Sequence, residues 1–499
     1  MTARITPHQF NGTVKIPGSK SHTIRQLLIA SLADGESVIK DPLDSLDTRS
    51  CIEACKAFGA EVLGVRSEEL GVRSEECGVT SEEGGVRSEE CGVTSEHNEK
   101  ISLLTPHSSL LIEELRNFKI VGNNAFRRNT KLTASINVGN SGTTLYLALA
   151  AAGLHSEWIE FTGDESIQRR SASLLLDALS GLGIQVRSRN GCAPISIKGP
   201  YTGGRVNLHC PTSQYLSALL IAAPLAPSGT VTEIEIPLLN EKPYIDMTLS
   251  YLKAQNIPFE AAPDYSFFRI PGGSSWKPFP ADKTRQVLSV PADFSSAAFP
   301  AAAAVISGGE VTLLGLDPND SQGDKYFFEM LKKMGCDVNW RQSDNDGEKE
   351  WALTVSRKGS LSGGVFDLNE TPDLLPAAAV VAAFAQGDTS LVNVAHARIK
   401  ETDRITVMAQ ELAKLGVCCT ELPDGLIVHG KGALFPHGMS NGDSIPEIIG
   451  NNDHRIVMAF AAAALGSPVP VNITTAESAA VTYPQFLNLL NAQNIKKNL

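Results

Sequence analysis

The stretch I-K-E-T-D-R-I-T-V-M-A-Q-E-L-A-K-L-G-V-C-C (399–419) carries the features from which we infer both the fold and the site. Apolar residues recur at spacings of three and four after Thr402 and Asp403, which predicts a helix that either residue could cap. Gly416 follows the last apolar residue, where a helix often ends in the left-handed conformation. The stretch therefore predicts a helix, a glycine stop and then a strand.

A run of charged residues stands at the start of this helix. Lys400, Glu401, Asp403 and Arg404 lie within five positions of one another. A cation in the first helical turn lies at the end where the helix dipole disfavours it. The arrangement favours an anionic ligand bound by Lys400 and Arg404, and the alternative is a solvated charged turn.

The pattern of helix, Gly or Asn, and strand occurs six times, at a spacing of roughly 80 residues once an insertion is set aside. Units of this size are too large for solenoid repeats, so we expect six βαβ-type units, three to a domain, with ligands in the cleft between the domains. The copies are 52–62, 175–186, 247–259, 326–338, 407–419 and 486–497, and their stop residues are Gly59, Gly183, Asn256, Gly335, Gly416 and Asn494.

The insertion, at about 64–97, is a tandem heptad of the form L-G-V-R-S-E-E. Glycine in every unit costs about 1 kcal/mol each in a helix, which argues against a coiled coil. Low hydrophobicity and surplus Glu favour a disordered excursion in a surface turn. A partner-binding role is the alternative.

The composition indicates a globular protein without a membrane or nucleic-acid partner. The chain has 499 residues, 42% of them hydrophobic and 20% charged, and a formal net charge of −12. Residues 64–99 hold ten Glu against three Arg, so the remainder is only mildly acidic and can contain a basic pocket. No apolar run approaches the roughly 20 residues of a membrane helix, and the N-terminus lacks the apolar core of a signal peptide. The nine cysteines lack metal-ligand spacing. We expect a cytoplasmic monomer whose partners are small-molecule substrates, with no metal or cofactor.

Two glycine turns lie at predicted strand-to-helix junctions. In K-I-P-G-S-K-S-H-T-I-R (15–25), Lys20 and Arg25 flank a helix start that suits a phosphate. The spacing of a P-loop is absent, so a nucleotide is not expected. In V-G-N-S-G-T-T-L-Y (138–146), Gly142 lets the backbone approach a ligand.

Further helix starts carry polar or ionised groups. Each could be a simple cap, but their repetition across equivalent units predicts that helix N-termini converge on one cleft and form an anion site. These starts are T-G-D-E-S-I-Q-R-R-S (162–171), P-T-S-Q-Y-L-S-A-L-L (211–220), P-A-D-F-S-S-A-A-F (291–299), T-P-D-L-L-P (371–376) and N-N-D-H-R-I-V-M-A-F (451–460).

Together the P-G-S-K-S, N-x-G-T, T-S-Q, I-K-E-T-D-R and N-D-H-R motifs resemble the 5-enolpyruvylshikimate-3-phosphate synthase family, in family order over nearly the whole chain. The resemblance implies two inside-out α/β domains of three units each, with the active site in the cleft between them. We expect one discontinuous domain at 1–17 plus 289–499 and a second at 18–288.

The reaction implied by the resemblance moves a carboxyvinyl group from phosphoenolpyruvate to the 5-hydroxyl of shikimate 3-phosphate and releases phosphate. Asp373 would accept the hydroxyl proton, Glu401 would protonate the vinyl carbon, and Lys20 would join them as a catalytic residue. The residues implied for phosphoenolpyruvate are Lys20, Gly142, Arg170, Gln214, Arg404 and Arg455. Those implied for shikimate 3-phosphate are Lys20, Ser21, Arg25, Thr212, Ser213, Gln214, Asp373 and Lys400.

The chain departs from the family pattern at several positions. Val481 stands where the family has a Lys that contacts phosphoenolpyruvate, Tyr146 replaces an Arg, and Glu241 replaces a Ser that contacts the shikimate phosphate. His396 and Ser171 replace an Asn and a Pro. The loss of positive charge leaves open a weakened or non-catalytic member that binds shikimate 3-phosphate. A less favoured alternative is the sister transferase that acts on UDP-N-acetylglucosamine, which shares the fold and usually has a loop Cys as its acid; Cys192 is the only candidate for that Cys.

Overall fold

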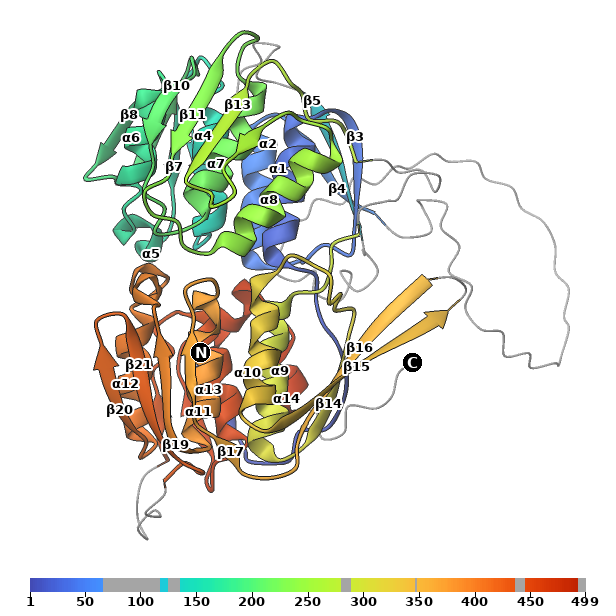
Figure 1. Ribbon diagram of the computed structural model, residues 1–499, viewed down its shortest axis with the longest axis vertical. Helices are drawn as coiled ribbons and strands as arrows, with labels where there is room; N and C mark the ends of the chain where they lie inside the picture. The colour runs from blue at the N-terminus through green and yellow to red at the C-terminus, as the bar shows by residue number, and fades with distance from the viewer. Residues whose placement is uncertain (66–116, 124–134, 280–288, 346–347, 436–444, 492–499) are drawn as a thin grey trace, which may run out of the picture.

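The structure is a computed structural model, and it describes residues 1–65, 117–123, 135–279, 289–345, 348–435 and 445–491. It has two α/β domains, which lie one above the other in Figure 1. Domain I contains helices α1 to α8, and domain II contains α9 to α14 together with the first two strands. Within the described ranges, no helix is long and apolar enough to cross a membrane.

Each domain has apolar helices at its centre and sheets at its surface (Figure 1). One set of helices is buried almost along its entire length, because a helix that is apolar on all sides must be enclosed. These helices pack against one another within each domain. They are α1 (Lys20–Leu32), α4 (Gly142–Ala152) and α7 (Gln214–Ala222) in domain I, and α9 (Phe294–Ser307), α11 (Leu375–Ala383) and α13 (His454–Ala464) in domain II.

A second set of helices has a polar face and lies nearer the surface. It consists of α2 (Leu46–Ala57), α5 (Glu165–Arg169), α6 (Ser173–Gly181) and α8 (Lys242–Ala254) in domain I, and α10 (Tyr326–Lys333), α12 (Arg404–Lys414) and α14 (Phe486–Asn491) in domain II.

The described strands form six sheets, in agreement with the six units predicted from the sequence. In three of them two parallel strands are joined through a buried helix, and an antiparallel hairpin completes the sheet, so each of these units is β-α-β-α-β-β. A fourth sheet has the same strand pairing, but all of domain I lies between its first strand and the helix α9 that leads to the next strand. The sheets of domain I are β3 (Asp34–Lys40), β5 (Asn117–Asn123) and β4 (Glu61–Val65); β6 (Ser135–Asn137), β7 (Ile159–Thr162), β9 (Cys192–Lys198) and β8 (Gln185–Arg189); and β10 (Gly204–Asn207), β11 (Val231–Glu235), β13 (Phe267–Pro271) and β12 (Glu260–Ala261).

The N-terminal strands complete two sheets of domain II, which makes this domain discontinuous in sequence. Strand β2 (Gly12–Lys15) pairs in parallel with β14 (Glu310–Leu314), and β1 (Ala3–Ile5) pairs antiparallel with β23 (Val471–Ile473). The other strands of domain II are β15 (Cys336–Asn345), β16 (Glu348–Arg357), β17 (Leu361–Ser362), β18 (Val365–Asp367), β19 (Ala385–Val392), β20 (Cys418–Leu422), β21 (Gly425–Lys431) and β22 (Glu447–Ile448).

Two separate hydrophobic cores follow this division. One contains buried residues between Ile24 and Val290. The other combines residues from Ile5 to Ile16 with residues from Ala292 to Leu490. The exact domain limits, 1–17 plus 289–499 and 18–288, stay a prediction that these two cores support.

The helix stops have the backbone conformation expected of them. The φ angles of Gly59, Gly183, Asn256, Gly335 and Gly416 are 88°, 88°, 53°, 102° and 75°, all in the region that favours Gly and Asn. The sixth stop, Asn494, lies outside the described residues.

The predicted start of the insertion, at about residue 64, falls at the end of β4. This strand continues to Val65, where it pairs with the first residue of β5. Gly64 and Val65 belong to the strand because their backbones pair with Phe118 and Asn117 of β5. The heptads from residue 66 onward lie outside the described ranges.

Candidate active site

A cavity of about 830 Å³ lies between the two domains and is lined mainly by helix starts of both. Its size suits two small ligands. All but one of the site residues predicted from the sequence line it. These are Lys20, Ser21, Arg25, Gly142, Arg170, Thr212, Ser213, Gln214, Asp373, Lys400, Glu401 and Arg455.

The exception is Arg404, which is buried beneath the cavity floor in domain II. Asp403 caps helix α12, as the sequence predicted, and Arg404 is the first residue of that helix. Its guanidinium donates Nε to Asp453 Oδ2 at 2.8 Å, Nη1 to Asp373 Oδ1 at 2.8 Å and Nη2 to Glu401 Oε2 at 2.6 Å. Arg404 therefore holds three carboxylates rather than facing the cavity as the resemblance implied.

Asp373 is bound from two further directions. Arg455, the second residue of α13, donates Nη2 to Asp373 Oδ2 at 2.8 Å and Nη1 to Ser295 Oγ at 2.6 Å. The Lys400 ammonium lies 4.0 Å from Asp373 Oδ1. This carboxylate is fixed in position and surrounded by cations.

The cations control the protonation of both predicted catalytic carboxylates. Burial alone would raise the pKa of Asp373, but attraction by Arg455, Lys400 and Arg404 holds that pKa well below its usual range. The pKa of Glu401 is likewise held well below its usual range, because Arg404 and Arg170 outweigh the effect of burial. Without ligands, both groups are ionised at neutral pH.

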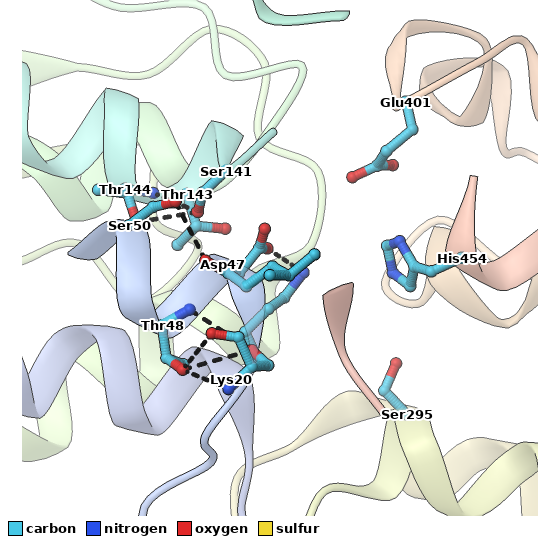
Figure 2. A network of polar contacts seen from close by, with 12 residues as sticks. Lys20, Asp47, Thr48, Ser50, Ser141, Thr143, Thr144, Ser295, Glu401 and His454 are labelled. Atoms are coloured by element: carbon cyan, nitrogen blue, oxygen red, sulfur yellow. Dashed lines mark hydrogen bonds and ion pairs between the residues drawn. The ribbon is translucent and has the colours of Figure 1, made fainter. Parts of the chain in front are cut away.

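The domain I wall carries its cations more loosely. Lys20, at the start of α1, forms an ion pair with Asp47 Oδ2 at 3.0 Å. Arg170 donates Nη2 to Ser166 Oγ at 2.7 Å and lies 3.6 Å from Glu401 Oε1 across the cavity. Figure 2 shows Lys20 and Asp47 on one side and Glu401 on the other.

Gly142 lets Arg170 approach the first turn of α4 closely. A Cβ atom at this position would lie 2.7 Å from Arg170 Nη1. With a larger residue at position 142, the guanidinium would have to shift away from its present place. Nearby, Gln214 Nε2 donates to Thr143 Oγ1 at 3.0 Å.

Arg25 lines the cavity, but its hydrogen bonds are internal. Its Nε donates to Thr248 Oγ1 at 2.9 Å, and its Nη groups donate to Ser217 Oγ and to the carbonyls of Ser21 and Tyr244. Burial lowers the pKa of Arg25 to about 10. In this structure Arg25 joins α1, α7 and α8, whereas the resemblance assigned it to a ligand.

Glu241 occupies the junction of Thr212, Ser213 and Lys400. Its Oε2 accepts hydrogen bonds from Thr212 Oγ1 at 3.0 Å, from Ser213 N at 2.9 Å and from Ser213 Oγ at 2.9 Å. Its Oε1 pairs with the Lys400 ammonium. All three predicted ligand-binding residues are thus engaged by one carboxylate of the chain.

Sequence reasoning missed His454 and Asp47. The imidazole of His454 is buried, and within the described ranges neither ring nitrogen has a hydrogen-bond partner. Burial, with Lys20 and Arg455 nearby, lowers the pKa of His454 well below its usual range, so the ring is neutral. Figure 2 shows the ring between Glu401 and Ser295. His454 lies beside Arg455 in the N-D-H-R motif, and this proximity is a signal from which it could have been predicted.

Asp47 is paired with Lys20 inside the first turn of α2, and burial raises its pKa despite Lys20. Asp47 contacts Lys20, the predicted catalytic Lys, over a separation of 27 residues, and no local sequence pattern predicts such a contact.

The departures from the family pattern fall in different places. Tyr146 lines the main cavity and packs edge-on against Tyr215, with ring centroids 5.0 Å apart. His396 and Ser171 also line it. Val481 does not: it lines a second cavity of about 580 Å³, which shares Asn452 with the first.

Hydrogen bonds and ion pairs across the cleft join the domains. Tyr244 Oη donates to Asp324 Oδ2 at 2.8 Å, and burial raises the pKa of Asp324 to about 6. Ser166 Oγ donates to the Glu401 carbonyl at 3.3 Å. Within the described part of the chain, no cluster of His, Cys, Asp or Glu could hold a metal ion.

Comparisons with known proteins agree with this geometry. The sequence profile described as EPSP synthase (3-phosphoshikimate 1-carboxyvinyltransferase) matches residues 5–92 and 110–490. The 3-phosphoshikimate 1-carboxyvinyltransferases of Acetivibrio thermocellus and Ruminiclostridium cellulolyticum are 38% and 37% identical to the chain, and each alignment covers 98% of it and 98% and 97% of the relative. A solved EPSP synthase structure from Acinetobacter baumannii is similar with a TM-score of 0.70 and 25% identity, over 98% of this chain and 97% of that one.

Proposed function

The chain belongs to the EPSP synthase family, and on that premise we propose that it transfers the carboxyvinyl group of phosphoenolpyruvate to the 5-hydroxyl of shikimate 3-phosphate. Phosphate is released, and the reaction serves the shikimate pathway to aromatic amino acids. The observation that carries the proposal is the pair of ionised carboxylates, Asp373 and Glu401, set on one buried guanidinium at the edge of a cation-lined cavity.

The reaction needs a base for the hydroxyl and an acid for the methylene carbon. The oxygen of the substrate 5-hydroxyl attacks the substituted vinyl carbon, and Asp373 accepts the hydroxyl proton. Glu401 delivers a proton to the methylene carbon, which becomes a methyl group. Removal of a proton from that methyl group then restores the double bond as the carbon–oxygen bond to phosphate breaks.

Ligand binding supports these roles through electrostatics. Two multiply charged anions entering the cavity draw Arg455, Lys400 and Arg170 toward themselves, and their negative charge raises the pKa of Asp373 and Glu401. Both pKa values start below their usual range, so the shift brings each carboxyl toward a state in which it can exchange a proton at neutral pH. Glu401 must take up its proton before it can act as the acid.

Each ligand is held by residues from both walls of the cavity. Lys20, Arg170 and Arg455 hold phosphoenolpyruvate, with Gly142 and Gln214 at the turn beside them. Ser21, Thr212, Ser213 and Lys400 hold shikimate 3-phosphate. Arg404 acts through the carboxylates that it positions, and Arg25 acts through the helices that it joins.

We also propose that the protein is a cytoplasmic monomer whose partners are these two small molecules, without a nucleic-acid partner. The net charge of −12 is unfavourable for binding nucleic acid. Size-exclusion chromatography with light scattering measures the oligomeric state directly.

A second candidate is a member that binds shikimate 3-phosphate but transfers the carboxyvinyl group poorly. The observation that favours it is the loss of two family cations, at Tyr146 and Val481, and the gain of a carboxylate at Glu241. Phosphate release separates the two candidates. The enzyme releases phosphate only when both substrates are present, and Asp373→Asn serves as the control that binds without turnover. Binding of shikimate 3-phosphate without phosphate release would establish the second candidate.

A further inference from the structure

Resting on the proposed function, we propose that Glu241 is a specificity-determining residue: its carboxylate occupies the phosphate subsite of the hydroxylated substrate, and the substrate phosphate must displace it. The affinity of the chain for a phosphorylated ligand is therefore set by competition with its own side chain. The geometry around Glu241 carries this inference.

The donors around Glu241 are of the type that binds phosphate. They are a backbone N–H at the start of the nine-residue helix α7, two hydroxyl groups and one ammonium group, contributed by Ser213, Thr212 and Lys400. Helix N-termini and charge-assisted hydrogen bonds are the usual means by which proteins hold phosphate oxygens. No donor in this set is specific for a carboxylate.

A second observation points to a ligand at the same place. The His396 side chain is 5% exposed and lines the cavity, and its Nε2 has no hydrogen-bond partner among the residues that the structure describes. It lies close enough to Glu241 for each group to influence the pKa of the other. A phosphate has more oxygens than a carboxylate, and it could use this additional nitrogen.

The backbone of Glu241 also has a conformation that is rare for this residue type. Its φ is 59°, in the left-handed region that side chains other than Asn, Asp and Gly rarely adopt. The residue precedes α8 without capping it. The hydrogen bonds of the carboxylate thus go to the cavity wall and not to its own helix.

Glu241 and a phosphate cannot both use these donors as anions. The titratable groups that face Glu241 are Lys400, His396 and Asp373 from domain II and Arg25 from α1. Burial would raise the pKa of Glu241, but the Lys400 ammonium outweighs burial and lowers that pKa, so the carboxylate is ionised. Burial lowers the pKa of His396, so its ring is neutral at pH 7. Once Lys400 turns to a phosphate, Glu241 must leave the donors or take up a proton.

The test compares two ligands that differ only in the phosphate. Calorimetry gives dissociation constants for shikimate 3-phosphate and for shikimate, with wild type, Glu241→Ser and Glu241→Gln. Glu241→Ser should bind shikimate 3-phosphate at least tenfold more tightly than wild type, while affinity for shikimate changes less than threefold. Glu241→Gln, which keeps the shape without the charge, should shift in the same direction.

Glu165→Gln is the matched control. Glu165 is an exposed carboxylate that lines the same cavity and makes no contact with the donors of Glu241. Its removal should change both constants less than threefold, which separates local competition from a general change in cavity charge. A similar gain with Glu165→Gln would overturn the inference.

Equal losses for both ligands in Glu241→Ser and Glu241→Gln would also overturn it, because they would show a structural role. This failure differs from failure of the proposed function. In the first case wild type still releases phosphate from phosphoenolpyruvate and shikimate 3-phosphate. In the second it neither binds shikimate 3-phosphate nor releases phosphate, and the inference falls with the function.

Discussion

In domain II, Arg404 beneath the cavity and Arg455 in its wall have side chains only 1% and 4% exposed, and they bind the proposed catalytic carboxylates directly. On the domain I wall, Lys20 and Arg170 are 13% and 11% exposed; Lys20 pairs with Asp47, and Arg170 donates to Ser166 and lies 3.6 Å from Glu401. Buried ion pairs fix geometry, whereas more exposed cations can change partners at smaller cost. The comparison indicates that domain II holds the reacting groups ready, while domain I is arranged to exchange its partners for ligands.

The largest expected effect tests this difference through stability. Arg404→Gln leaves three carboxylates without their shared cation and should lower the free energy of unfolding by about 3–5 kcal/mol. Arg170→Gln, its counterpart on the other wall, should lower it by less than about 1 kcal/mol. Urea unfolding of the two ligand-free variants measures both values. Equal losses would show that the walls do not differ in this way.

The second effect concerns the reacting groups. Asp373→Asn and Glu401→Gln should each lower turnover at least about 10²-fold, the usual scale for acid–base groups. Binding of shikimate 3-phosphate should stay within a few-fold, because the ligand is held mainly by other residues. Steady-state kinetics and calorimetry give both quantities, and a variant with wild-type turnover would remove its residue from the mechanism.

The third prediction concerns His454, a neutral side chain that is buried in domain II between Glu401 and Ser295. The pKa of His454 is lowered by burial, so below about pH 6.5 the unfolded chain binds a proton that the folded chain excludes. Stability should therefore fall as the pH falls from about 6.5 toward the folded pKa, by up to about 1.4 kcal/mol per pH unit.

His454→Gln removes this titration. The difference in unfolding free energy between wild type and variant should be constant above pH 7 and should change in favour of the variant from pH 6.5 downward. Measuring the pair at each pH cancels the other groups, including Asp324. A constant difference down to pH 5 would mean that the imidazole is not buried in its neutral form.

The sequence predicted most of the fold because the fold depends on local signals. Helix periodicity and five described stop residues, such as Gly416, identified the repeated unit, and apolar helices such as α11 identified the interior. The motifs also predicted which helix starts line the cavity. Each motif and each helix stop is encoded within about twenty residues of sequence.

The partners of the charged groups could not be predicted in the same way. Arg404 contacts Asp453, 49 positions away, and Lys400 contacts Glu241, 159 positions away. Whether a cation faces a ligand or an internal carboxylate depends on such long-range contacts, which leave no periodic pattern in the sequence. For this reason Arg404 and Arg25 were expected to face a ligand, and Glu241 was recognised only as a departure.

The fourth prediction restores family cations on each wall. Tyr146→Arg places a charge inside the main cavity on domain I, whereas Val481→Lys must reach past Asn452 from the second cavity on domain II. Direct attraction to an anion weakens with distance, so Val481→Lys should raise kcat/KM for phosphoenolpyruvate only several-fold. The double variant should exceed either single one. Unchanged or lower kcat/KM in all three would show that the cations present already suffice.

The smallest effect on activity is expected from shortening the connection between β4 and β5, residues 66–116. Strand β4 ends at Val65 opposite Asn117 of β5, so the ends of the connection 66–116 are adjacent and a short turn could join them. Each doubling of loop length costs only about 0.6 kcal/mol, so removing residues 68–114 should leave the melting temperature within a few degrees, or slightly higher, and kcat/KM unchanged.

The deletion of 64–97 is the control, because it removes Gly64 and Val65 and with them two pairs of the β4–β5 ladder, and it should lower the melting temperature more. Differential scanning calorimetry and phosphate-release kinetics on both deletions decide the matter: loss of folding or turnover in the shorter deletion would assign the connection a structural or functional role, since the strand pairs and the cavity are intact in that variant.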